Sequence, residues 1–521
     1  MILKQFVDEG LGNSSYLIGS EETGSTAVVD PQRDGEKYVQ VADGLGLRLE
    51  YALDTHLHAD FVSGARELAA LLGLRVGASA EAQLAYEHLP LREGDTLALG
   101  ELSLGVLATP GHSPEHISFT VSGPKQSALA AVFTGGALIV GGAARTDLLG
   151  HEHAAPLARQ LYHTLHHKLL TLPEAVNVYP THGAGSFCIA PTSPDRVTTI
   201  GRERTANHLA RARDEDEFVA LALEGLPSYP TYFKELRPVN QRGPRVLGGL
   251  PALPPLTPAA MRDWWAQGGA VLDVRPARAF AGGHIPGAFG IALETPLITW
   301  AGWLIPFGTP LVLVADSDAE RQEAVRQLIR IGYDDLRGYL AGGLAAWTEA
   351  GLPVERVPSI DVAELRRQLE RGKGPIVLDV RQDDEWLAGH IPGAVHIENG
   401  RLSYADLLLP PDRPIAVHCQ HRNRSTAGLA VLVVDNRTRE IRVAVGAPDY
   451  FADARRGAVD MTLAVRSPGS TLKPFVYGMA FDERIVTPGT LVADVSTRFG
   501  EYAPRNFDSA FHGELTIADA L

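Results

Sequence analysis

One stretch of this chain occurs twice, and the duplication restricts what the chain can fold into. AVLDVRPARAFAGGHIPGAFGI at 270–291 returns as IVLDVRQDDEWLAGHIPGAVHI at 376–397. The shared His-Ile-Pro-Gly begins at His284 and again at His390, 106 residues later. That period is too long for a solenoid repeat and fits a small domain that has been duplicated. Each copy reads strand, loop, strand and helix, so we predict two similar α/β domains.

Length and composition indicate further domains. The chain has 521 residues, which at ~150 residues per domain corresponds to three or four domains. It is 45% hydrophobic and 21% charged, which is typical of globular proteins. The net charge of -15, without a basic block, argues against nucleic acid or an anionic membrane as a partner. Two cysteines and the lack of a long apolar run predict a cytoplasmic protein without a membrane span.

The remaining segments differ in character. Short β-rich runs alternate with helix-like stretches over about the first 210 residues, which predicts a layered α/β domain at 1–224. Residues 225–256 are rich in Pro and Gly and read as a linker. The two repeats then give domains at 257–356 and 357–432, and the sequence changes character again in a tail at 433–521.

Histidines are concentrated in the first domain. Of 18 histidines, 12 lie between His56 and His208. His56, His58 and Asp60 belong to the run DTHLHADF, while His112 lies in TPGHSPEH and His182 in YPTHG. Neutral imidazoles combined with carboxylates suit Zn or Fe(II). We expect another group of histidines to be solvated helix residues instead: His151, His153, His163, His166 and His167.

The order of these motifs resembles the metallo-β-lactamase fold superfamily over about residues 1–215, and more narrowly its glyoxalase II and persulfide dioxygenase branch. The resemblance implies an αββα sandwich with a metal site at one edge. Two positions depart from the family pattern. Phe61 stands where the family has a histidine, and Gly136, in TGGAL, stands where it has a metal-bridging aspartate.

The two departures decide which metal site the resemblance implies. The family's first metal position maps onto His56, His58 and His112, all of which are present. The second keeps only Asp60 and His182, so we expect one Zn or Fe(II) ion at most. The resemblance to the dioxygenases implies mononuclear iron held by two histidines and a carboxylate. Here the two histidines are present as His56 and His112, but the carboxylate is missing. Three histidines with a water form a feasible zinc site, and weak or absent metal binding is the third possibility.

The second repeat continues into the segment PIAVHCQHRNRS, which has the features of a sulfur-transfer site. Cys419 ends a β-rich run, and Arg424 follows five residues later, where a helix is expected to begin. Backbone amides and a helix N-terminus at such a turn lower the thiol pKa and bind an anion. The thiolate can then carry a sulfane sulfur as a persulfide. Together with DVR and GHIPGA, this segment resembles the rhodaneses, a sulfurtransferase family, and implies small sulfur compounds such as glutathione persulfide and thiosulfate as partners.

The first repeat resembles rhodanese too, but its loop reads VADSDAER. Ala315, Asp316 and Ser317 stand where the cysteine would be. We therefore expect this domain to serve as a spacer or docking domain without catalysis. The whole arrangement resembles the persulfide dioxygenase–sulfurtransferase fusions of bacterial sulfide detoxification.

The tail carries a different motif. Ser470 and Lys473 form an SxxK, in which the lysine can activate the serine. With RSPGSTLKPFVYG and TRFGEYAPRNFD around it, the tail resembles the transpeptidase domain of penicillin-binding proteins. The printed chain reaches Leu521 without the family's SxN and KTG motifs, so we expect an inactive fused fragment. We also expect the second rhodanese copy to be truncated, without its closing strand and helix.

A first prediction concerns Ser470. Acylation needs a positioned base, oxyanion donors and an aligned carbonyl, and this tail supplies only the base, Lys473. We expect that a fluorescent penicillin does not label Ser470 covalently and that proteases cut rapidly within 433–521. A stoichiometric, Ser470-dependent penicilloyl adduct on the purified chain would contradict this.

The sequence thus predicts an α/β multidomain protein: an αββα sandwich, two small rhodanese-like domains with the second truncated, and an incomplete transpeptidase-like tail. The function that we expect is cytoplasmic sulfur metabolism. Two alternatives stay open, a metal-dependent thioester-type hydrolase and a catalytically inert scaffold. A penicillin-binding transpeptidase fragment ranks below them.

Overall fold

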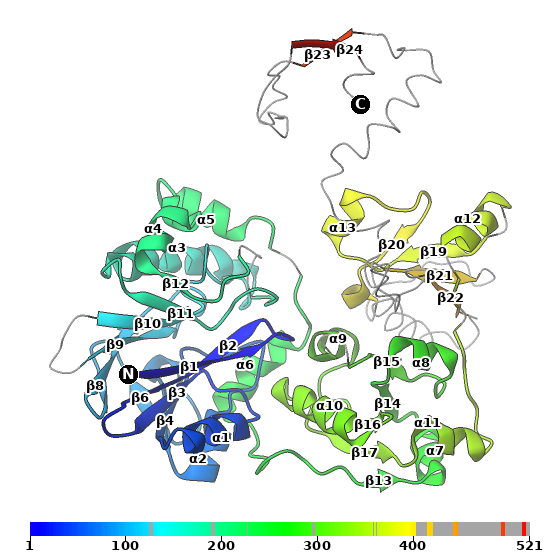
Figure 1. Ribbon diagram of the computed structural model, residues 1–521, viewed down its shortest axis with the longest axis horizontal. Coiled ribbons are helices and arrows are strands. Elements are labelled where there is room, and N and C mark those ends of the chain that lie inside the picture. Colours follow the sequence, from blue (N-terminus) through cyan, green and yellow to red (C-terminus); the bar gives the residue numbers. More distant parts are fainter. Residues whose placement is uncertain are drawn as a thin grey trace. The chain divides into compact units, whose positions relative to one another are not determined.

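The computed structural model describes residues 1–123, 129–188, 193–226, 228–293, 297–357, 359–360, 362–372, 374–402, 414–419, 441–445, 491–494 and 513–516 (Figure 1). The chain separates into two compact units, Met1–Pro448 and Asp449–Leu521. Three of the residues singled out in the sequence, Arg424, Ser470 and Lys473, lie outside the described residues.

The first unit begins with a domain built on two six-stranded sheets. The first sheet has the order β1-β2-β3-β4-β5-β6 and comprises β1 (Ile2–Asp8), β2 (Asn13–Gly19), β3 (Ser25–Val29), β4 (Arg48–Leu53), β5 (Arg75–Ser79) and β6 (Leu89–Leu91). The second has the order β12-β11-β10-β9-β8-β7 and comprises β7 (Thr96–Leu99), β8 (Leu102–Ala108), β9 (Ile117–Ser122), β10 (Leu129–Gly135), β11 (Asn177–Pro180) and β12 (Thr198–Thr199).

Helices cover the outer faces of both sheets (Figure 1). They are α1 (Glu36–Gly44), α2 (Ala65–Leu72), α3 (His151–His167), α4 (Ile200–Ala206) and α5 (Glu215–Leu223). Ile18, Phe119 and Phe133 belong to the core that the two sheets share. Leu68 of α2 packs with residues of the first sheet, and Leu161 of α3 with residues of the second. These layers confirm the αββα sandwich that the sequence predicted.

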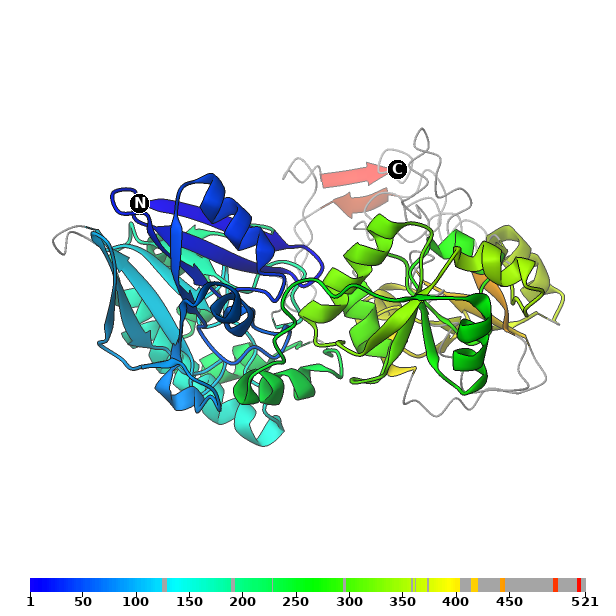
Figure 2. The same ribbon diagram turned by 90° about the horizontal axis from the view of Figure 1, so that it is seen from below.

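The next domain contains a parallel five-stranded sheet of order β13-β17-β16-β14-β15. Its strands and helices are drawn in green in Figure 2. Its strands are β13 (Pro255–Leu256), β14 (Ala270–Asp273), β15 (Phe289–Gly290), β16 (Leu311–Val314) and β17 (Leu336–Leu340). Its helices are α7 (Pro258–Ala266), α8 (Ala277–Gly282), α9 (Leu297–Leu304), α10 (Asp318–Arg330) and α11 (Gly343–Glu349). The strands of such a sheet are apolar throughout because both faces are buried, as LVLV in β16 illustrates.

The second copy repeats this topology strand for strand, with the order β18-β22-β21-β19-β20. It comprises β18 (Ser359–Ile360), α12 (Val362–Glu370), β19 (Ile376–Asp379), α13 (Asp383–Ala388), β20 (Val395–His396), β21 (Ile415–His418) and β22 (Ile441–Val445). β22 pairs in parallel with both β21 and β18, the place that β17 takes in the first copy. The expected loss of the closing strand is therefore not observed. The expected loss of the closing helix concerns residues beyond the described ones.

The segment expected as a linker carries regular structure. Residues 225–256 contain α6 (Phe233–Arg242) as well as β13. Phe233, Leu236 and Asn240 are buried at helical spacing, although Pro238 lies inside the helix. The proline and glycine content of the segment concealed this pattern, and α6 turns out to contact the candidate site.

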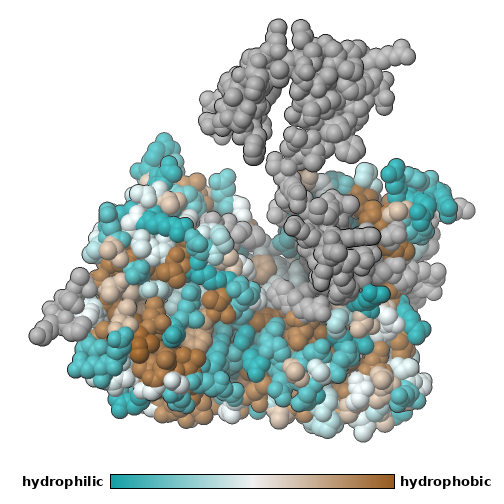
Figure 3. Space-filling view, viewed as in Figure 1, coloured by the Kyte–Doolittle hydropathy of each residue, from teal (hydrophilic) through white to brown (hydrophobic). Residues whose placement is uncertain are grey.

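The second unit is described at two strands, β23 (Leu491–Asp494) and β24 (Gly513–Thr516), which pair antiparallel. None of the helices in the described residues has both the length and the apolar composition needed to cross a bilayer. On the face seen in Figure 3, apolar residues gather over part of the N-terminal domain and are bordered by hydrophilic ones.

Candidate metal centre and sulfur-transfer site

Three loops at one edge of the sandwich bring the histidine motifs of the sequence together. The first loop follows β4 and carries His56, the second joins β8 to β9 and carries His112, and the third follows β11 and carries His182. Metal-ligating nitrogens of these three side chains lie within 4.8 Å of one another. The three residues are 5%, 4% and 1% exposed. A cluster this close and this buried could hold one metal ion.

The Nδ1 atom of each of these three imidazole rings has its own hydrogen-bond partner. His56 Nδ1 lies 2.8 Å from Thr55 Oγ1, which itself donates to Asp30. His112 Nδ1 donates to the Arg145 carbonyl at 2.6 Å, and His182 Nδ1 lies 3.2 Å from Asn13 Oδ1. Such partners fix the ring orientation and leave Nε2 for an ion.

Electrostatics also suit metal binding. Burial, together with the neighbouring histidines, lowers the pKa of His56 and of His112 well below the usual value. Histidine binds a metal as the neutral imidazole, so these two rings need not lose a proton to do so.

His58, the expected third ligand, faces a different cluster. Its Nε2 lies 3.2 Å from Asp30 Oδ1 and 3.9 Å from Asp54 Oδ1. Burial opposes protonation, but Asp30 and Asp54 outweigh it and raise the pKa of His58. Its ring stacks on Phe61, with 4.1 Å between the ring centroids. The geometry therefore favours His182 over His58 as the third ligand of the histidine cluster.

Gly136 leaves no space for the carboxylate that the family places there. A Cβ added at Gly136 would lie 2.5 Å from His112 Cδ2 and 3.0 Å from the Ala144 Cβ. The Gly136 amide donates to His116 Nε2 at 3.0 Å. The backbone thus approaches the histidines directly, and the candidate ligands here are three imidazoles.

Asp60 lies on the other side of His182. Its Oδ2 accepts a hydrogen bond from Asn13 Nδ2 at 2.8 Å and lies 3.4 Å from His182 Nδ1. Asp60, His182 and Cys188 form a second group of possible ligands within 4.8 Å of one another. Cys188 was not among the ligands predicted from the sequence. Its position six residues after His182, in THGAGSFC, was the signal that could have found it.

Asn240 of α6 holds the backbone of the loop that carries His56. Its Nδ2 donates to the His58 carbonyl at 2.8 Å and to the Phe61 carbonyl at 2.9 Å. Its Oδ1 accepts from the Ser63 amide at 2.9 Å. Tyr232, at the start of α6, donates to the Asp60 carbonyl at 2.9 Å. The helix α6, which lies outside the sandwich, thus fixes the shape of the loop that carries His56.

Two further contacts reach the same loop. Arg237 of α6 forms a double ion pair with Glu115, at 2.9 and 2.7 Å, and Glu115 Oε1 accepts from the Leu57 amide at 2.9 Å. The Val62 amide donates to the carbonyl of Arg330, the last residue of α10, at 2.7 Å. The first rhodanese-like domain therefore supports the loop as well, which gives it a structural role without a catalytic cysteine.

Replacing Asn240 by alanine should weaken metal binding. The change removes three hydrogen bonds and leaves buried backbone groups unpaired, at a cost of roughly 1–3 kcal/mol. We expect the metal affinity to fall about 10–100-fold, the scale seen when the partners of metal ligands are lost. Competition with a chromophoric chelator measures this. Gln241→Ala is the control, because Gln241 donates to the Ala82 carbonyl outside the loop. Equal affinity in the two variants would contradict a positioning role.

Cys419 directly follows β21, and its side chain is fully buried. The residue before it, His418, has its Nδ1 atom 3.5 Å from the Asp379 carboxylate. Asp379 also pairs with Arg381 at 2.6 Å. Both cysteines of the chain, Cys188 and Cys419, are thiols. The position of Cys419 at the carboxyl end of a central parallel strand agrees with the expected sulfur-transfer site. Its expected partner Arg424 lies outside the described residues.

The first copy shows what replaces the cysteine. Asp273 pairs with Val314 as Asp379 pairs with His418, so Ala315 is the residue that corresponds to Cys419. Glu320 Oε2 accepts from the amides of both Asp316 and Ser317, each at 3.0 Å. A carboxylate of the chain itself therefore occupies loop amides that could otherwise bind an anion.

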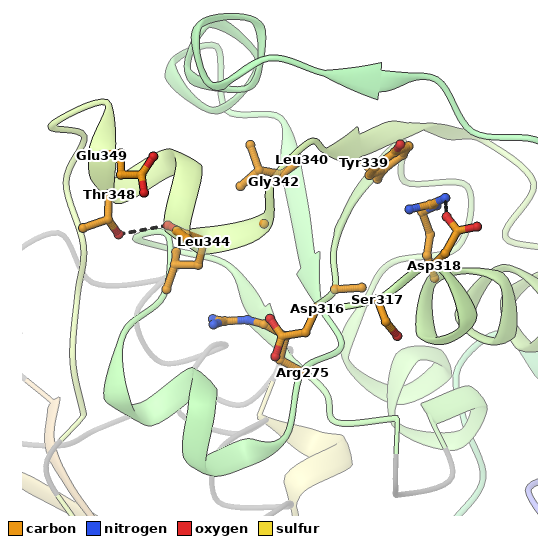
Figure 4. Close-up of a pocket in the computed structure, with 14 residues that line it drawn as sticks. Arg275, Asp316, Ser317, Asp318, Tyr339, Leu340, Gly342, Leu344, Thr348 and Glu349 are labelled. Carbon is orange, nitrogen blue, oxygen red and sulfur yellow. Dashed lines mark hydrogen bonds and ion pairs between the residues drawn. The ribbon is translucent and has the colours of Figure 1, made fainter.

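A pocket of about 810 Å³ lies beside this loop (Figure 4). Asp316, Asp318 and Glu349 contribute carboxylates to its lining. Two arginines also line it, and both are paired with carboxylates: the Arg275 guanidinium with Asp273 at 2.6 Å, and Arg321 with Asp318. This distribution of charge disfavours an anionic sulfur donor such as thiosulfate.

A cysteine alone should not restore activity to the first copy. In a Cys419→Ser background, Ala315→Cys is expected to show no thiosulfate:cyanide sulfurtransferase activity above that background. The reason is that Glu320 still occupies the loop amides and the pocket still carries the carboxylates. Thiocyanate formation is the measurement. A rate within about tenfold of the protein with Cys419 intact would contradict this explanation.

Comparisons with known proteins identify the families that these domains resemble. The Metallo-beta-lactamase superfamily matches residues 8–182, and the Rhodanese-like domain matches 257–350 and 361–447. Human mitochondrial persulfide dioxygenase ETHE1 is 31% identical over 208 residues, which are 40% of this chain and 75% of that protein. The chain belongs to the metallo-beta-lactamase superfamily.

Other members of the metallo-beta-lactamase superfamily are similar over different spans. A solved metallo-beta-lactamase from Staphylococcus aureus superposes with a TM-score of 0.58 at 30% identity, covering 65% of this chain and 98% of that one. A cytoplasmic hydroxyacylglutathione hydrolase of Arabidopsis thaliana is 34% identical over 172 residues, 33% of this chain and 63% of that enzyme. The similarity to the Staphylococcus protein thus extends well beyond the sandwich.

The tail matches a different family. The Penicillin binding protein transpeptidase domain matches residues 429–521. Penicillin-binding protein 1C of Escherichia coli is 50% identical over 95 residues, which are 18% of this chain but only 12% of that protein. This match overlaps the second rhodanese match at residues 429–447, where β22 lies.

Proposed function

We propose that this protein oxidises a small persulfide at an ion held by His56, His112 and His182, and transfers sulfane sulfur through Cys419. The observation that carries the proposal is a buried cluster of three imidazoles in the same chain as a rhodanese-type cysteine. The similarity to a persulfide dioxygenase supports the first reaction, and the rhodanese match supports the second.

The residues present fit a divalent ion. Each ring of the cluster keeps one nitrogen for it, and two of the rings have a lowered pKa. A bound Fe(II) would supply activation of dioxygen. The overall reaction is RSSH + O₂ + H₂O → RSH + H₂SO₃, in which the outer sulfur is oxidised and dioxygen is reduced.

The chain's own contribution is to bind and orient the substrate. Three uncharged ligands leave the charge of a divalent ion uncompensated, which favours an anionic persulfide at the site. The hydrogen bond from His112 to the Arg145 carbonyl and the contacts of Asn240 keep the loops in place. Burial of the histidines excludes bulk water from the reacting atoms.

Cys419 would act in the second reaction. Its thiolate attacks the outer sulfur of thiosulfate, a cysteine persulfide forms, and sulfite leaves with the electron pair of the broken S–S bond. The same exchange run backwards passes sulfur to sulfite, so one reaction's product is the other's acceptor. Glutathione persulfide and thiosulfate are the substrates that we propose.

A metal-dependent thioester-type hydrolase is the second candidate. Three imidazoles with an open position are a known arrangement for catalytic zinc, and the similarity to a hydroxyacylglutathione hydrolase favours it. An inert scaffold is the third alternative, and it requires that the histidine cluster binds no metal.

Oxygen uptake distinguishes these proposals. The full chain loaded with Fe(II) should consume oxygen when given glutathione persulfide and release sulfite, while His112→Ala should not. His151→Ala is the matched control, because His151 is exposed on α3. Hydrolysis of a glutathione thioester without oxygen uptake would contradict the dioxygenase proposal and support the hydrolase. Absence of bound metal would exclude both metal-dependent reactions, and absence of sulfur transfer through Cys419 as well would leave only the scaffold.

A further inference from the structure

A cavity of about 290 Å³ lies where the N-terminal domain meets the first rhodanese-like domain. It is lined by the start of α1, by α2, by α10 and by the segment 246–250, which connects the two domains. All of these residues belong to the unit Met1–Pro448. The cavity shares no lining residue with the histidine cluster or with the pocket beside Ala315, so neither proposed reaction uses it.

The walls of this cavity are mainly apolar. They are formed by Leu68, Ala70, Leu71, Val246, Leu250 and Ile329. Leu71 is 58% exposed and Val246 is 36% exposed, so two large apolar side chains stay open to solvent at the same place. Covering them would remove apolar surface from water, which favours a ligand with an apolar body.

The volume of the cavity limits the size of its occupant. An apolar cavity of about 150 Å³ is large enough for benzene. A cavity about twice that size can take an aromatic ring with a short side chain, but an α-helix, about 10 Å across, is too wide for it. The cavity therefore suits a small molecule rather than an element of a partner protein.

The charged side chains that line the cavity are not balanced. Five of them are present, and three have an ionic partner, in the pairs Arg33–Asp334, Arg326–Glu323 and Asp34–Arg330. The other two are the carboxylates of Glu36 and Glu67, for which the described residues supply no cation. The lining thus carries an excess of negative charge.

The two carboxylates differ in their surroundings. Glu67 is buried and accepts from the amides of Leu247, Gly248 and Gly249 at 2.8, 2.5 and 3.2 Å, which holds the connecting segment against α2. Glu36 is exposed and has no hydrogen-bond partner among the described residues. A Cβ added at Gly249 would lie 3.3 Å from Glu36 Oε1, so this carboxylate lies close to the connecting segment. Glu36 is therefore available to a ligand.

We propose that this cavity binds a small amphipathic cation, a primary amine with a compact apolar body. The body packs against Leu71 and Val246, and the ammonium group, which stays charged near neutral pH, donates to Glu36. Two carboxylates without a cation disfavour an anion, so persulfides and thiosulfate are not the ligands of this site. The lining has no cysteine, histidine, serine or tyrosine, so the molecule is bound without chemical change. This site does not depend on the proposed function.

Tryptamine is the probe for the cavity, and calorimetric titration of the full chain measures its binding. Indole-3-propionate is the matched anion, because it has the same ring and a carboxylate in place of the ammonium group. We expect saturable binding of one tryptamine per chain, and binding of indole-3-propionate that is weaker by about tenfold or more. Absence of saturable tryptamine binding, or equal affinity for the two compounds, overturns the proposal.

Two pairs of variants locate the site. Glu36→Gln keeps the shape of the side chain and should weaken tryptamine binding by about tenfold, while Asp43→Asn, at an exposed position of α1 outside the cavity, should not. Leu71→Arg should abolish binding, while Leu72→Arg, at a neighbouring residue that is 42% exposed and does not line the cavity, should not. Wild-type affinity in Glu36→Gln or in Leu71→Arg, or an equal loss in either control, overturns the site. Circular dichroism confirms that each variant is folded, and oxygen uptake does not enter this test.

Discussion

Replacement of His182 by alanine is expected to lower the affinity of the histidine cluster for Fe(II) by more than about a hundredfold. That is beyond the 10–100-fold typical for losing a residue that only supports a ligand. The reason is geometric: ligand atoms of His56, His112 and His182 converge within 4.8 Å. Metal analysis after dialysis against a weak chelator measures the loss.

His58→Ala should behave differently. His58 is fully buried against Asp30, and removing it takes the charged partner from a buried carboxylate that keeps only hydrogen bonds from Thr55 and Thr181. Breaking such a pair costs about 3–5 kcal/mol, so we expect a clear loss of thermal stability. Metal content at a temperature where the variant stays folded should remain close to that of the wild-type protein.

The two variants together decide the third ligand. The exposed His151 on α3 provides the control variant His151→Ala, which should change neither stability nor metal content. If His58→Ala loses the ion while His182→Ala retains it, the ligand set inferred from the family pattern is correct and the geometric one is wrong.

Replacement of Cys419 by serine should abolish sulfur transfer from thiosulfate to cyanide, with a loss of more than about a thousandfold, the scale of losing a nucleophile. The first rhodanese-like domain has Ala315 at the corresponding position and cannot compensate. Cys188→Ser is the matched control and should retain the activity. Mass spectrometry after thiosulfate treatment should find one added sulfur atom on the peptide that contains Cys419. Activity that survives Cys419→Ser would refute the assignment.

Much of the architecture could be predicted from local sequence. The repeated VLDVR and GHIPG segments predicted the duplication because each is a strand followed by a turn whose residues are set by short-range geometry. The five-stranded sheets share one strand order, as that repeat implied. The histidine motifs likewise marked the loops that meet at one edge of the sandwich, and Cys419 lies at the end of a central strand as expected.

Elements without a distinctive local pattern were missed. α6 was concealed by the prolines and glycines around it, and its importance comes from Asn240, whose hydrogen bonds join residues about 180 positions apart in the sequence. β22 was missed for another reason. Its residues lie where the rhodanese match and the transpeptidase match overlap, and parallel strand pairing depends on backbone groups, so a segment that also matches another family can complete the sheet.

The sequence by itself determined which chemical groups the protein has: the histidine motifs, the missing carboxylate at Gly136, and one cysteine in place for sulfur transfer. The tertiary structure decided how those groups combine. His58 and His56 are two residues apart, but Asp30 attracts one ring while His112 and His182 surround the other. Cys188 meets Asp60, and Glu320 fills the loop of the first rhodanese-like domain. These choices depend on side-chain directions and on contacts between distant segments, which spacing along the chain does not specify.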